Sequence, residues 1–269
     1  MTRRTDLFDS TYSHFSDSVL AQVRAETFDR DIGQNSWLTA DEFERFVARL
    51  ELAPAQHVLE VACGAGGPAC ELARRSRCQG TGIDSNEHGI ATARRAAEGL
   101  GLGGQVRFEQ ADASAALPFA DASFDALLCI DSMTHFPDRP SVLREWRRVL
   151  RPGGRALFTD PVVITGAVSN AELALRSSIG FFLFVPPGTN ERMIGDSGLR
   201  LAAQEDATAN AALVSGRWHR ARAAHRAELL RIEGEERFEG LQRFFEVVER
   251  LTRERRLSRF AYLVERPRG

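Results

Sequence analysis

The residues best suited to hold and act on a ligand lie at four turns between residues 60 and 135. A glycine-rich segment, Glu60-Val61-Ala62-Cys63-Gly64-Ala65-Gly66-Gly67-Pro68, follows a short apolar run. Glycines at such a turn let the backbone approach a ligand closely, and Pro suits the first turn of a helix. Asp84, Asp112 and His135 each follow a further apolar run. Carboxylates accept hydrogen bonds from hydroxyl and amino groups, and His exchanges a proton near neutral pH.

A parallel sheet would bring these turns together. Apolar runs alternate with helical stretches from residue 56 to about 160, which is the pattern of βαβ units. The carboxyl ends of parallel strands meet at one edge of a sheet, where open α/β sheets bind nucleotides. The pattern predicts strands at 57–62, 80–84, 105–110, 124–130, 154–160, 198–206 and 259–265, and helices at 69–75, 88–100 and 141–150.

The flanking segments are predicted to be mainly helical. Thr39 with Glu42, and Ser169 with Glu172, have the spacing of capping boxes. Residues from about 208 to 256 are predicted to form two helices. Because no repeat, low-complexity tract or linker interrupts the chain, we expect a single domain over 1–269. Its parts are a helical N-terminal lid (1–54), a ligand-binding core (55–165) and substrate-side helices with the last two strands (166–269).

Composition narrows the range of partners. The chain has 35 basic and 37 acidic residues and a formal net charge of −2, which argues against a dedicated nucleic-acid or membrane-surface protein. Every basic residue is Arg. Schiff-base catalysis, a Walker-type phosphate Lys and a Tyr/Lys dyad are therefore excluded, because each needs a Lys amine. A small-molecule partner is favoured.

The cysteines and the termini suggest the compartment. Cys63, Cys70, Cys78 and Cys129 match neither a paired C-x-x-C zinc site nor a disulfide framework, so we expect buried, reduced thiols and no metal site. The first residues lack the apolar run of a signal peptide. The longest apolar stretch, 179–185, is far shorter than the ~20 residues that span a bilayer. A cytoplasmic location without membrane contact is expected.

The glycines alone do not choose a cofactor. Gly64-x-Gly66-x-x-Ala69 also satisfies a relaxed dinucleotide fingerprint, and Asp84 stands where a ribose-binding acid is found. On these two features, an NAD(P)-dependent oxidoreductase remains an alternative.

Four ordered segments carry a more specific resemblance. They are VLEVACGAGG, GIDSN, EQADAS with LPFADASFDAL, and LREWRRVLRPGG. With them the chain resembles the class I S-adenosylmethionine-dependent methyltransferases over about residues 55–160. The flanking helices resemble the small-molecule branch, namely the sarcosine/dimethylglycine, tocopherol and natural-product methyltransferases. The resemblance implies a Rossmann-like, doubly wound α/β fold with a mostly parallel seven-stranded sheet, an N-terminal helical lid and a helical insert before the last strand.

The resemblance also implies roles for individual residues. The turn from Gly64 to Gly66 would hold the methionine part of S-adenosylmethionine, Asp84 its ribose, and Asp112 with Ala113 its adenine. The chain has Glu60 where the family usually has Asp, and Ala62, which narrows the turn, in place of Gly. The full set of expected cofactor-binding residues is Glu60, Ala62, Gly64, Gly66, Asp84, Ser85, Asp112, Ala113, Ile130 and Trp37.

The implied reaction is methyl transfer to an N, O or C atom of a small metabolite in natural-product metabolism. His135 is the candidate base, with a structural histidine as the alternative, and Trp37 either contacts a ligand or anchors the lid. The expected substrate-binding residues are Asp131, Met133, His135, Tyr12 and Phe181. A non-catalytic S-adenosylmethionine-binding protein remains an alternative, and a homodimer is compatible with the sequence.

Overall fold

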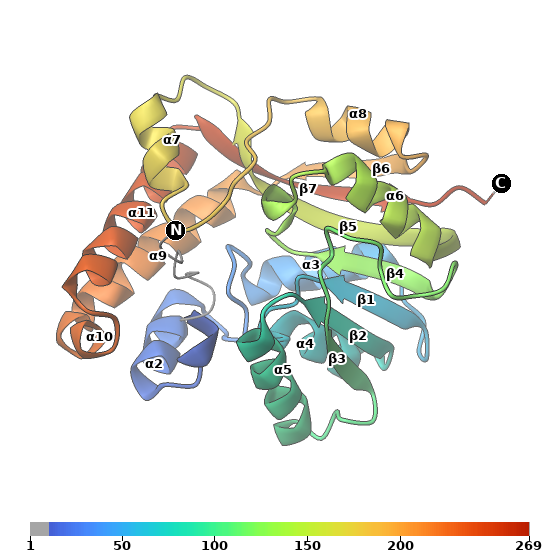
Figure 1. Ribbon diagram of the computed structural model, residues 1–269, viewed down its shortest axis with the longest axis horizontal. Coiled ribbons are helices and arrows are strands. Elements are labelled where there is room, and N and C mark those ends of the chain that lie inside the picture. Colours follow the sequence, from blue (N-terminus) through green and yellow to red (C-terminus); the bar gives the residue numbers. More distant parts are fainter. Residues whose placement is uncertain (1–10, 269) are drawn as a thin grey trace.

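A computed structural model describes residues 11–268, and its centre is a seven-stranded sheet (Figure 1). The strand order is β3-β2-β1-β4-β5-β7-β6. Parallel pairing joins β1 to β2 and β4, β2 to β3, and β4 to β5, whereas β7 is antiparallel to both of its neighbours. The strands are β1 (His57–Val61), β2 (Gln79–Asp84), β3 (Val106–Gln110), β4 (Phe124–Cys129), β5 (Leu150–Ile164), β6 (Arg200–Asp206) and β7 (Leu257–Glu265).

Helices cover both faces of the sheet and one of its ends. One face carries α3, α4 and α5, and the other carries α6 and α8. Figure 1 shows α7, α9, α10 and α11 grouped beyond one end of the sheet, with α2 next to them. The helices are α2 (Ser18–Thr27), α3 (Ala40–Leu50), α4 (Gly67–Ser76), α5 (Glu87–Gly99), the 3₁₀ turn η1 (Met133–His135), α6 (Arg139–Val149), α7 (Asn170–Arg176), α8 (Thr189–Asp196), α9 (Thr208–Ala224), α10 (Arg226–Glu233) and α11 (Glu235–Arg253).

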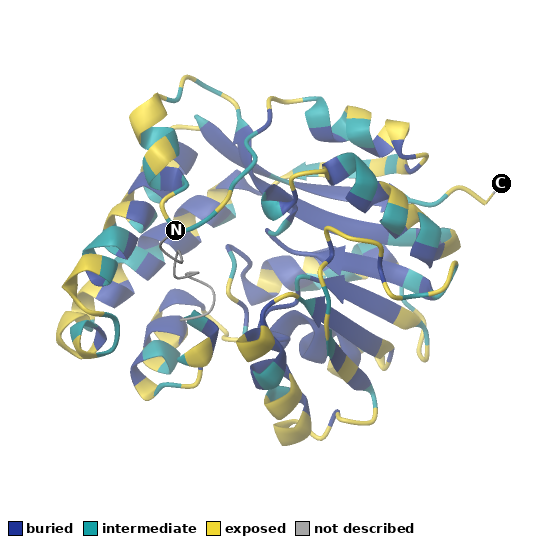
Figure 2. Cartoon of the chain, viewed as in Figure 1, coloured by how far each residue is buried: buried dark blue, intermediate teal, exposed yellow. Residues whose placement is uncertain are grey.

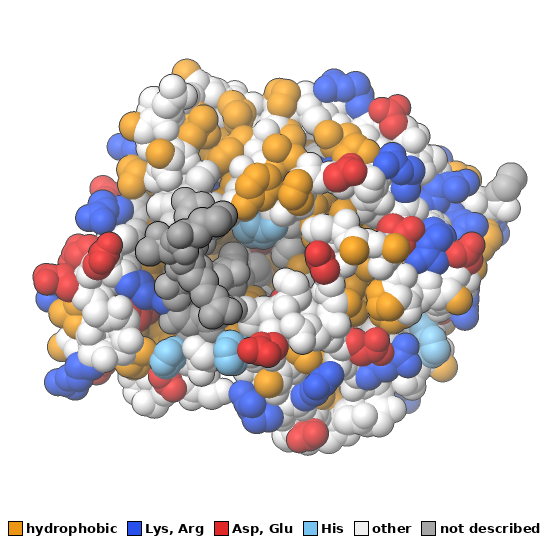
Figure 3. Space-filling model, viewed as in Figure 1, with side chains coloured by type: hydrophobic (Ala, Val, Ile, Leu, Met, Phe, Trp, Pro, Cys, Tyr) orange, Lys and Arg blue, Asp and Glu red, His pale blue; other side chains and the backbone are white. Residues whose placement is uncertain are grey.

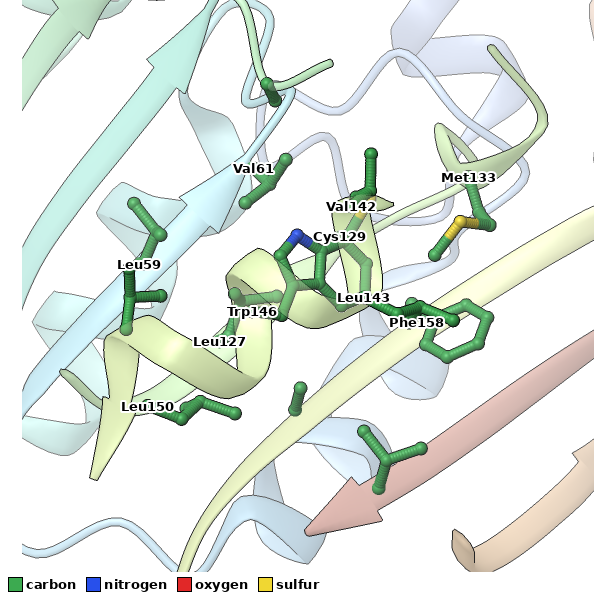
Figure 4. Close-up of a cluster of buried hydrophobic side chains, with 14 of the residues drawn as sticks. Leu59, Val61, Leu127, Cys129, Met133, Val142, Leu143, Trp146, Leu150 and Phe158 are labelled. Atoms are coloured by element: carbon green, nitrogen blue, oxygen red, sulfur yellow. The ribbon is translucent and has the colours of Figure 1, made fainter. Parts of the chain in front are cut away.

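The central strands are buried on both faces, as a parallel sheet between helices requires, and Figure 2 shows them dark blue inside a partly exposed helical shell. Successive side chains alternate between the faces, so Leu59 and Val61 pack toward α6 while Val58 packs toward α3. In Figure 4, Trp146 of α6 lies among side chains of β1, β4 and β5. Its indole meets the ring of Phe158 edge to face, with 5.6 Å between the centroids. This core fixes the carboxyl ends of the strands.

The fold confirms the predicted mostly parallel seven-stranded sheet with a helical insert before the last strand. One prediction was wrong, since residues 208–253 form three helices and not two. Gly234, with φ 75°, marks the second break, but no Gly or Pro marks the first break at His225. The sequence around His225 is compatible with a continuous helix, and tertiary packing decides where it ends.

The two predicted capping boxes differ in outcome. Ser169 and Glu172 form a complete box at the start of α7. At α3 the Thr39 hydroxyl accepts from the Glu42 N–H, but the Glu42 carboxylate binds Arg259 and Asn210 instead of closing the box. A buried ion pair has displaced a local helix-capping contact.

The four cysteines are free and buried, as predicted. No helix within residues 11–268 is long and apolar enough to cross a bilayer.

Candidate active site

A pocket of about 600 Å³ lies at the carboxyl ends of β1, β2, β3 and β4; we call it the strand-end pocket. Figure 3 shows a hollow in this face of the molecule, with hydrophobic side chains gathered along its upper rim. The sheet brings seven of the predicted cofactor residues to the pocket wall: Glu60, Ala62, Asp84, Ser85, Asp112, Ala113 and Ile130.

The glycine turn between β1 and α4 shapes one side of the strand-end pocket. Gly64 and Gly66 have φ values of 52° and 76°, in the left-handed region that glycine tolerates. A Cβ on Gly64 would collide with the hydroxyl of Tyr12, and one on Gly66 would overlap the ring of Phe108. Neither glycine lines the pocket itself. Their lack of a side chain lets Tyr12 and Phe108 pack closely against the turn. Ala62 also has a positive φ, of 56°, where glycine would be unstrained.

Glu60 is a buried acid in the pocket wall. Its side chain accepts a hydrogen bond from the backbone N–H of Ala69, in the first turn of α4. Its Oε2 is buried and has no hydrogen-bond partner among the described residues. Burial, together with the nearby charge of Asp84, raises the pKa of Glu60 to about 8. The pocket therefore holds a carboxyl group suited to a cationic or hydrogen-bond-donating ligand.

Two further acids end β2 and β3. Asp84 accepts hydrogen bonds from the N–H groups of Gly64 and Asn86, each at 2.8 Å, so it fixes the glycine turn as well as facing the pocket. Asp112 is exposed and accepts from the N–H of Ser114 at 2.8 Å. Ala113 and Ile130 are buried apolar wall residues beside these polar groups.

Tyr12, a predicted substrate-binding residue, lies in the wall of the strand-end pocket. Its phenol is 8% exposed, lies against Gly64 and forms a hydrogen bond with the side chain of Asn35. Burial, with the nearby charge of Asp84, raises the pKa of Tyr12, so the phenol stays neutral and can donate a hydrogen bond. Asn35 was missed by the sequence analysis because a single exposed amide carries no recognisable pattern.

A second, mainly apolar cavity of about 130 Å³ adjoins the strand-end pocket; we call it the aromatic cavity. Aromatic rings from the lid, from the segment after α7, and from α9 and α11 form much of its wall: Phe15, Trp37, Phe182, Trp218, Phe244 and Phe245. The two hollows share the wall residues Asn35, Ser36, Asp131, His135 and Ile179.

Trp37, which was predicted either to contact a ligand or to anchor the lid, lines the aromatic cavity and not the strand-end pocket. Its ring stacks on Phe244 at 6.3 Å and meets Phe245 edge to face at 6.2 Å. Its backbone N–H donates to Asp131 at 2.9 Å, and its carbonyl accepts from Asn210 at 2.7 Å. The lid is therefore anchored through Trp37, on the side of the second cavity.

Asp131 lies between the hollows with its carboxylate fully engaged. It accepts from the guanidinium of Arg259 and the hydroxyl of Thr159, both at 2.7 Å, besides the Trp37 N–H. Arg259 is fully buried and also pairs with Glu42 at 2.7 Å. These bonds fix the position of Asp131 in the wall of both hollows, and its predicted substrate contact stays a prediction.

His135, in η1, belongs to the wall of both hollows. Its Nδ1 lies 2.8 Å from the carbonyl oxygen of Phe181. Since a carbonyl only accepts, Nδ1 carries the proton, and Nε2 is the basic nitrogen of the neutral ring. Phe182 packs on the imidazole with 4.7 Å between centroids. Phe181 is 53% exposed at the rim of the strand-end pocket.

Met133 is not brought to either hollow. It is fully buried in the core cluster on the α6 face, which Figure 4 shows. Its neighbour Ser132, which precedes the 3₁₀ turn, does line the strand-end pocket.

Comparisons with known proteins identify the family. Residues 59–158 match a methyltransferase domain model. The methyltransferase GfsG of Streptomyces halstedii is 40% identical over 132 residues, which are 49% of this chain and 47% of that protein. The chain thus spans about half the length of this curated relative. The 27-O-demethylrifamycin SV methyltransferase of Amycolatopsis mediterranei is 30% identical over 203 residues, which are 72% of this chain and 74% of that protein.

The fold is shared with solved structures. A putative sarcosine dimethylglycine methyltransferase from Galdieria sulphuraria superimposes with a TM-score of 0.78 at 17% identity, covering 85% of this chain and 84% of that one. The matched domain model and the Amycolatopsis mediterranei relative decide between the cofactor families that the glycine pattern left open. The chain belongs to the class I S-adenosylmethionine-dependent methyltransferases.

Proposed function

We propose that this protein transfers a methyl group from S-adenosylmethionine, bound in the strand-end pocket, to a small molecule bound in the aromatic cavity. The observation that carries the proposal is that the two hollows share a wall, so their occupants would meet there. Holding two reactants in contact removes much of the entropic barrier to a bimolecular step. The natural-product relatives support a specialised metabolite as the acceptor.

The residues of the strand-end pocket fit this cofactor. The unpartnered, buried oxygen of Glu60 suits the α-ammonium group. The methionine part would lie beside it, along Ala62, Cys63 and Ala65 of the glycine turn, which line the pocket. Asp84, at the end of β2, suits the ribose hydroxyls. Adenine would then lie against the remaining predicted cofactor residues of the wall, which are Ser85, Asp112, Ala113 and Ile130.

S-adenosylmethionine supplies a methyl group on a sulfonium whose leaving group is a neutral thioether, so the protein contributes mainly positioning and exclusion of water. Tyr12 and Phe181 cover the strand-end pocket, and Trp37 encloses the aromatic cavity. When the acceptor is a hydroxyl or an ammonium, Nε2 of His135 removes its proton. Asp131 holds the shared wall in place.

The test is methyl transfer itself. The purified protein is incubated with methyl-labelled S-adenosylmethionine and a metabolite extract, and we expect label in a low-molecular-weight product and formation of S-adenosylhomocysteine. Asp84→Asn is expected to abolish both at limiting cofactor. Binding of S-adenosylhomocysteine without transfer of label to any compound would favour a non-catalytic binding protein.

We further propose action on free metabolites in the cytoplasm, with no nucleic-acid partner. The balanced charge and the four free thiols support this. Self-association as a homodimer stays a prediction, and light scattering of the purified protein tests it.

A further inference from the structure

Arg176, the last residue of α7, is a buried guanidinium in the wall of the aromatic cavity. It is 1% exposed. The guanidinium carbon, Cζ, lies 4.3 Å from the ring centroid of Phe182 and 5.1 Å from that of Phe244. Aromatic faces attract a cation but do not replace a hydrogen-bond acceptor.

No carboxylate within residues 11–268 forms an ion pair with Arg176, and its Nη1 is buried without an acceptor. The nearest acids are already engaged. Asp131 binds Arg259 at 2.7 Å, and Asp160 binds Arg139 at 2.6 Å. By contrast, the buried Arg222 in the same cavity wall is paired with Glu233 at 2.5 Å.

An unpaired buried charge costs several kcal/mol relative to a paired one. Burial lowers the pKa of Arg176 to about 9, which still leaves the guanidinium protonated at neutral pH. The fold therefore keeps a cation with an open hydrogen-bonding position inside an otherwise mainly apolar cavity. Such a group is typical of a binding site and not of a packing contact.

Arg176 also stands close to the proposed site of transfer. The ring of Phe182 contacts both Arg176 and His135, at 4.3 Å and 4.7 Å. Phe182 alone would thus separate an anion bound by Arg176 from the imidazole of His135. The rest of such a molecule would lie among Trp37, Trp218 and Phe245.

We propose that Arg176 binds a carboxylate of the methyl acceptor, so that the acceptor is a small monocarboxylic acid with an aromatic or apolar body. The guanidinium of Arg176 has no ion pair among the described residues and so matches a negative charge, and its planar fork matches a carboxylate. The carboxylate is the anchor, and the methylated atom lies on the His135 side. This inference rests on the proposed function, because it assigns the aromatic cavity to the acceptor.

The test measures binding and not turnover. The protein is first saturated with S-adenosylhomocysteine, as checked by calorimetry. Tryptophan fluorescence, to which Trp37 and Trp218 in the cavity wall contribute, then follows titration with benzoate and 3-phenylpropanoate and with their neutral amides. We expect at least one acid to bind ~10-fold or more tightly than its amide, because only the acid pairs with the buried cation.

Three variants locate the effect. Arg176→Met is expected to weaken binding of that acid by ~30-fold and to leave binding of its amide nearly unchanged. Arg176→Lys should retain part of the preference for the acid, because it keeps the charge but not the fork. The matched control is Arg243→Met on α11, next to Phe244 but exposed, which should change neither affinity.

Thermal melting separates this role from a structural one. Removing an unpaired buried charge should leave the melting temperature of Arg176→Met equal to or above that of the wild type. No preference for either acid over its amide, or an unchanged preference in Arg176→Met, would overturn the inference. Failure of S-adenosylhomocysteine to bind would instead contradict the proposed function.

Discussion

At the scale of single residues, each hollow has in its described wall a buried ionisable group with an open hydrogen-bonding position. Glu60 holds an unpartnered oxygen in the strand-end pocket, and Arg176 an unpartnered nitrogen in the aromatic cavity. Desolvation disfavours the charged forms of Glu60 and Arg176, and no partner charge compensates for it as it would in an ion pair. A cofactor with an ammonium group and an acceptor with a carboxylate would satisfy both at once.

The raised pKa of Glu60 predicts how stability depends on pH. The carboxyl pKa is about 8 in the folded protein and near 4.5 when solvated, so the folded state binds the proton more tightly. The contribution of Glu60 to stability is therefore full below about pH 4.5 and is lost as the pH rises through about 8. In the absence of cofactor, the melting temperature of wild type minus that of Glu60→Gln should fall between pH 5 and pH 8.5.

Glu60→Gln keeps the shape and removes the titration, so other groups cancel in the difference. A difference that stays constant over this pH range would show that Glu60 has an ordinary pKa. Glu44→Gln, at an exposed carboxylate, is the control and should give a difference that does not fall over the same range.

His135 gives a second prediction at this scale. Its Nδ1–H is held by the Phe181 carbonyl, which leaves Nε2 as the base. His135→Ala should keep S-adenosylmethionine affinity within about threefold, but lower turnover by ~10²-fold for an acceptor that must lose a proton. The wild type should lose activity at acid pH as the imidazole becomes protonated. The pH–rate profile of the variant should lack this acid-side decrease. Wild-type turnover in His135→Ala from pH 6 to pH 9 would leave His135 a structural residue.

At the scale of elements, a buried charge network joins the lid to the sheet. Arg259 of β7 pairs with Glu42 of α3 and with Asp131 after β4, and Asp131 holds the backbone of Trp37. These partners are far apart in sequence but meet where the two hollows share a wall. The network thereby joins four separate segments at Asp131, which is the one of these residues that lines both hollows.

Asp131→Asn tests this network. Asn tolerates the positive φ of 54° at this position, so the backbone should persist while Arg259 loses one of its two counterions. Breaking a buried pair costs ~3–5 kcal/mol, and chemical denaturation should show a loss of about that size. Arg200→Gln, which removes an exposed pair with Glu265, should cost less than about 1 kcal/mol. Equal losses in the two variants would contradict the network.

The sequence predicted the elements better than their contacts. The strands and the glycine turn were predictable because alternation and glycine spacing are local, and seven of the ten cofactor residues lie where the strand ends place them. The positions of Trp37 and Tyr12 were not predictable, because the fold of the lid depends on long-range contacts such as the hydrogen bond from Trp37 to Asp131 and the contact of Tyr12 with Gly64; their ligand roles stay predictions. Arg176 was missed because one Arg among 35 basic residues carries no local signal.

At the scale of the whole molecule, the strand-end pocket lies where the sheet meets the lid. Its wall includes Tyr12 and Asn35 of the lid as well as Glu60 and Asp84 of the sheet. A ligand in this pocket would contact both parts and bind only the folded chain. Ligands of that kind raise stability in proportion to the logarithm of their concentration.

The last prediction is therefore a cofactor-dependent melting temperature. At 100 times its dissociation constant, S-adenosylhomocysteine should add about 2.7 kcal/mol, which raises the melting temperature of a chain of this size by roughly 5–10 °C. NAD at the same concentration should cause no shift.

The expected single domain further predicts one cooperative unfolding transition that moves as a whole, because lid and sheet share the pocket. Asp84→Asn, which weakens both the glycine turn and the ribose contact, should reduce the shift at equal ligand concentration. A shift with NAD alone would overturn the assignment of the pocket, and two transitions, of which only one responded, would show that lid and sheet unfold separately.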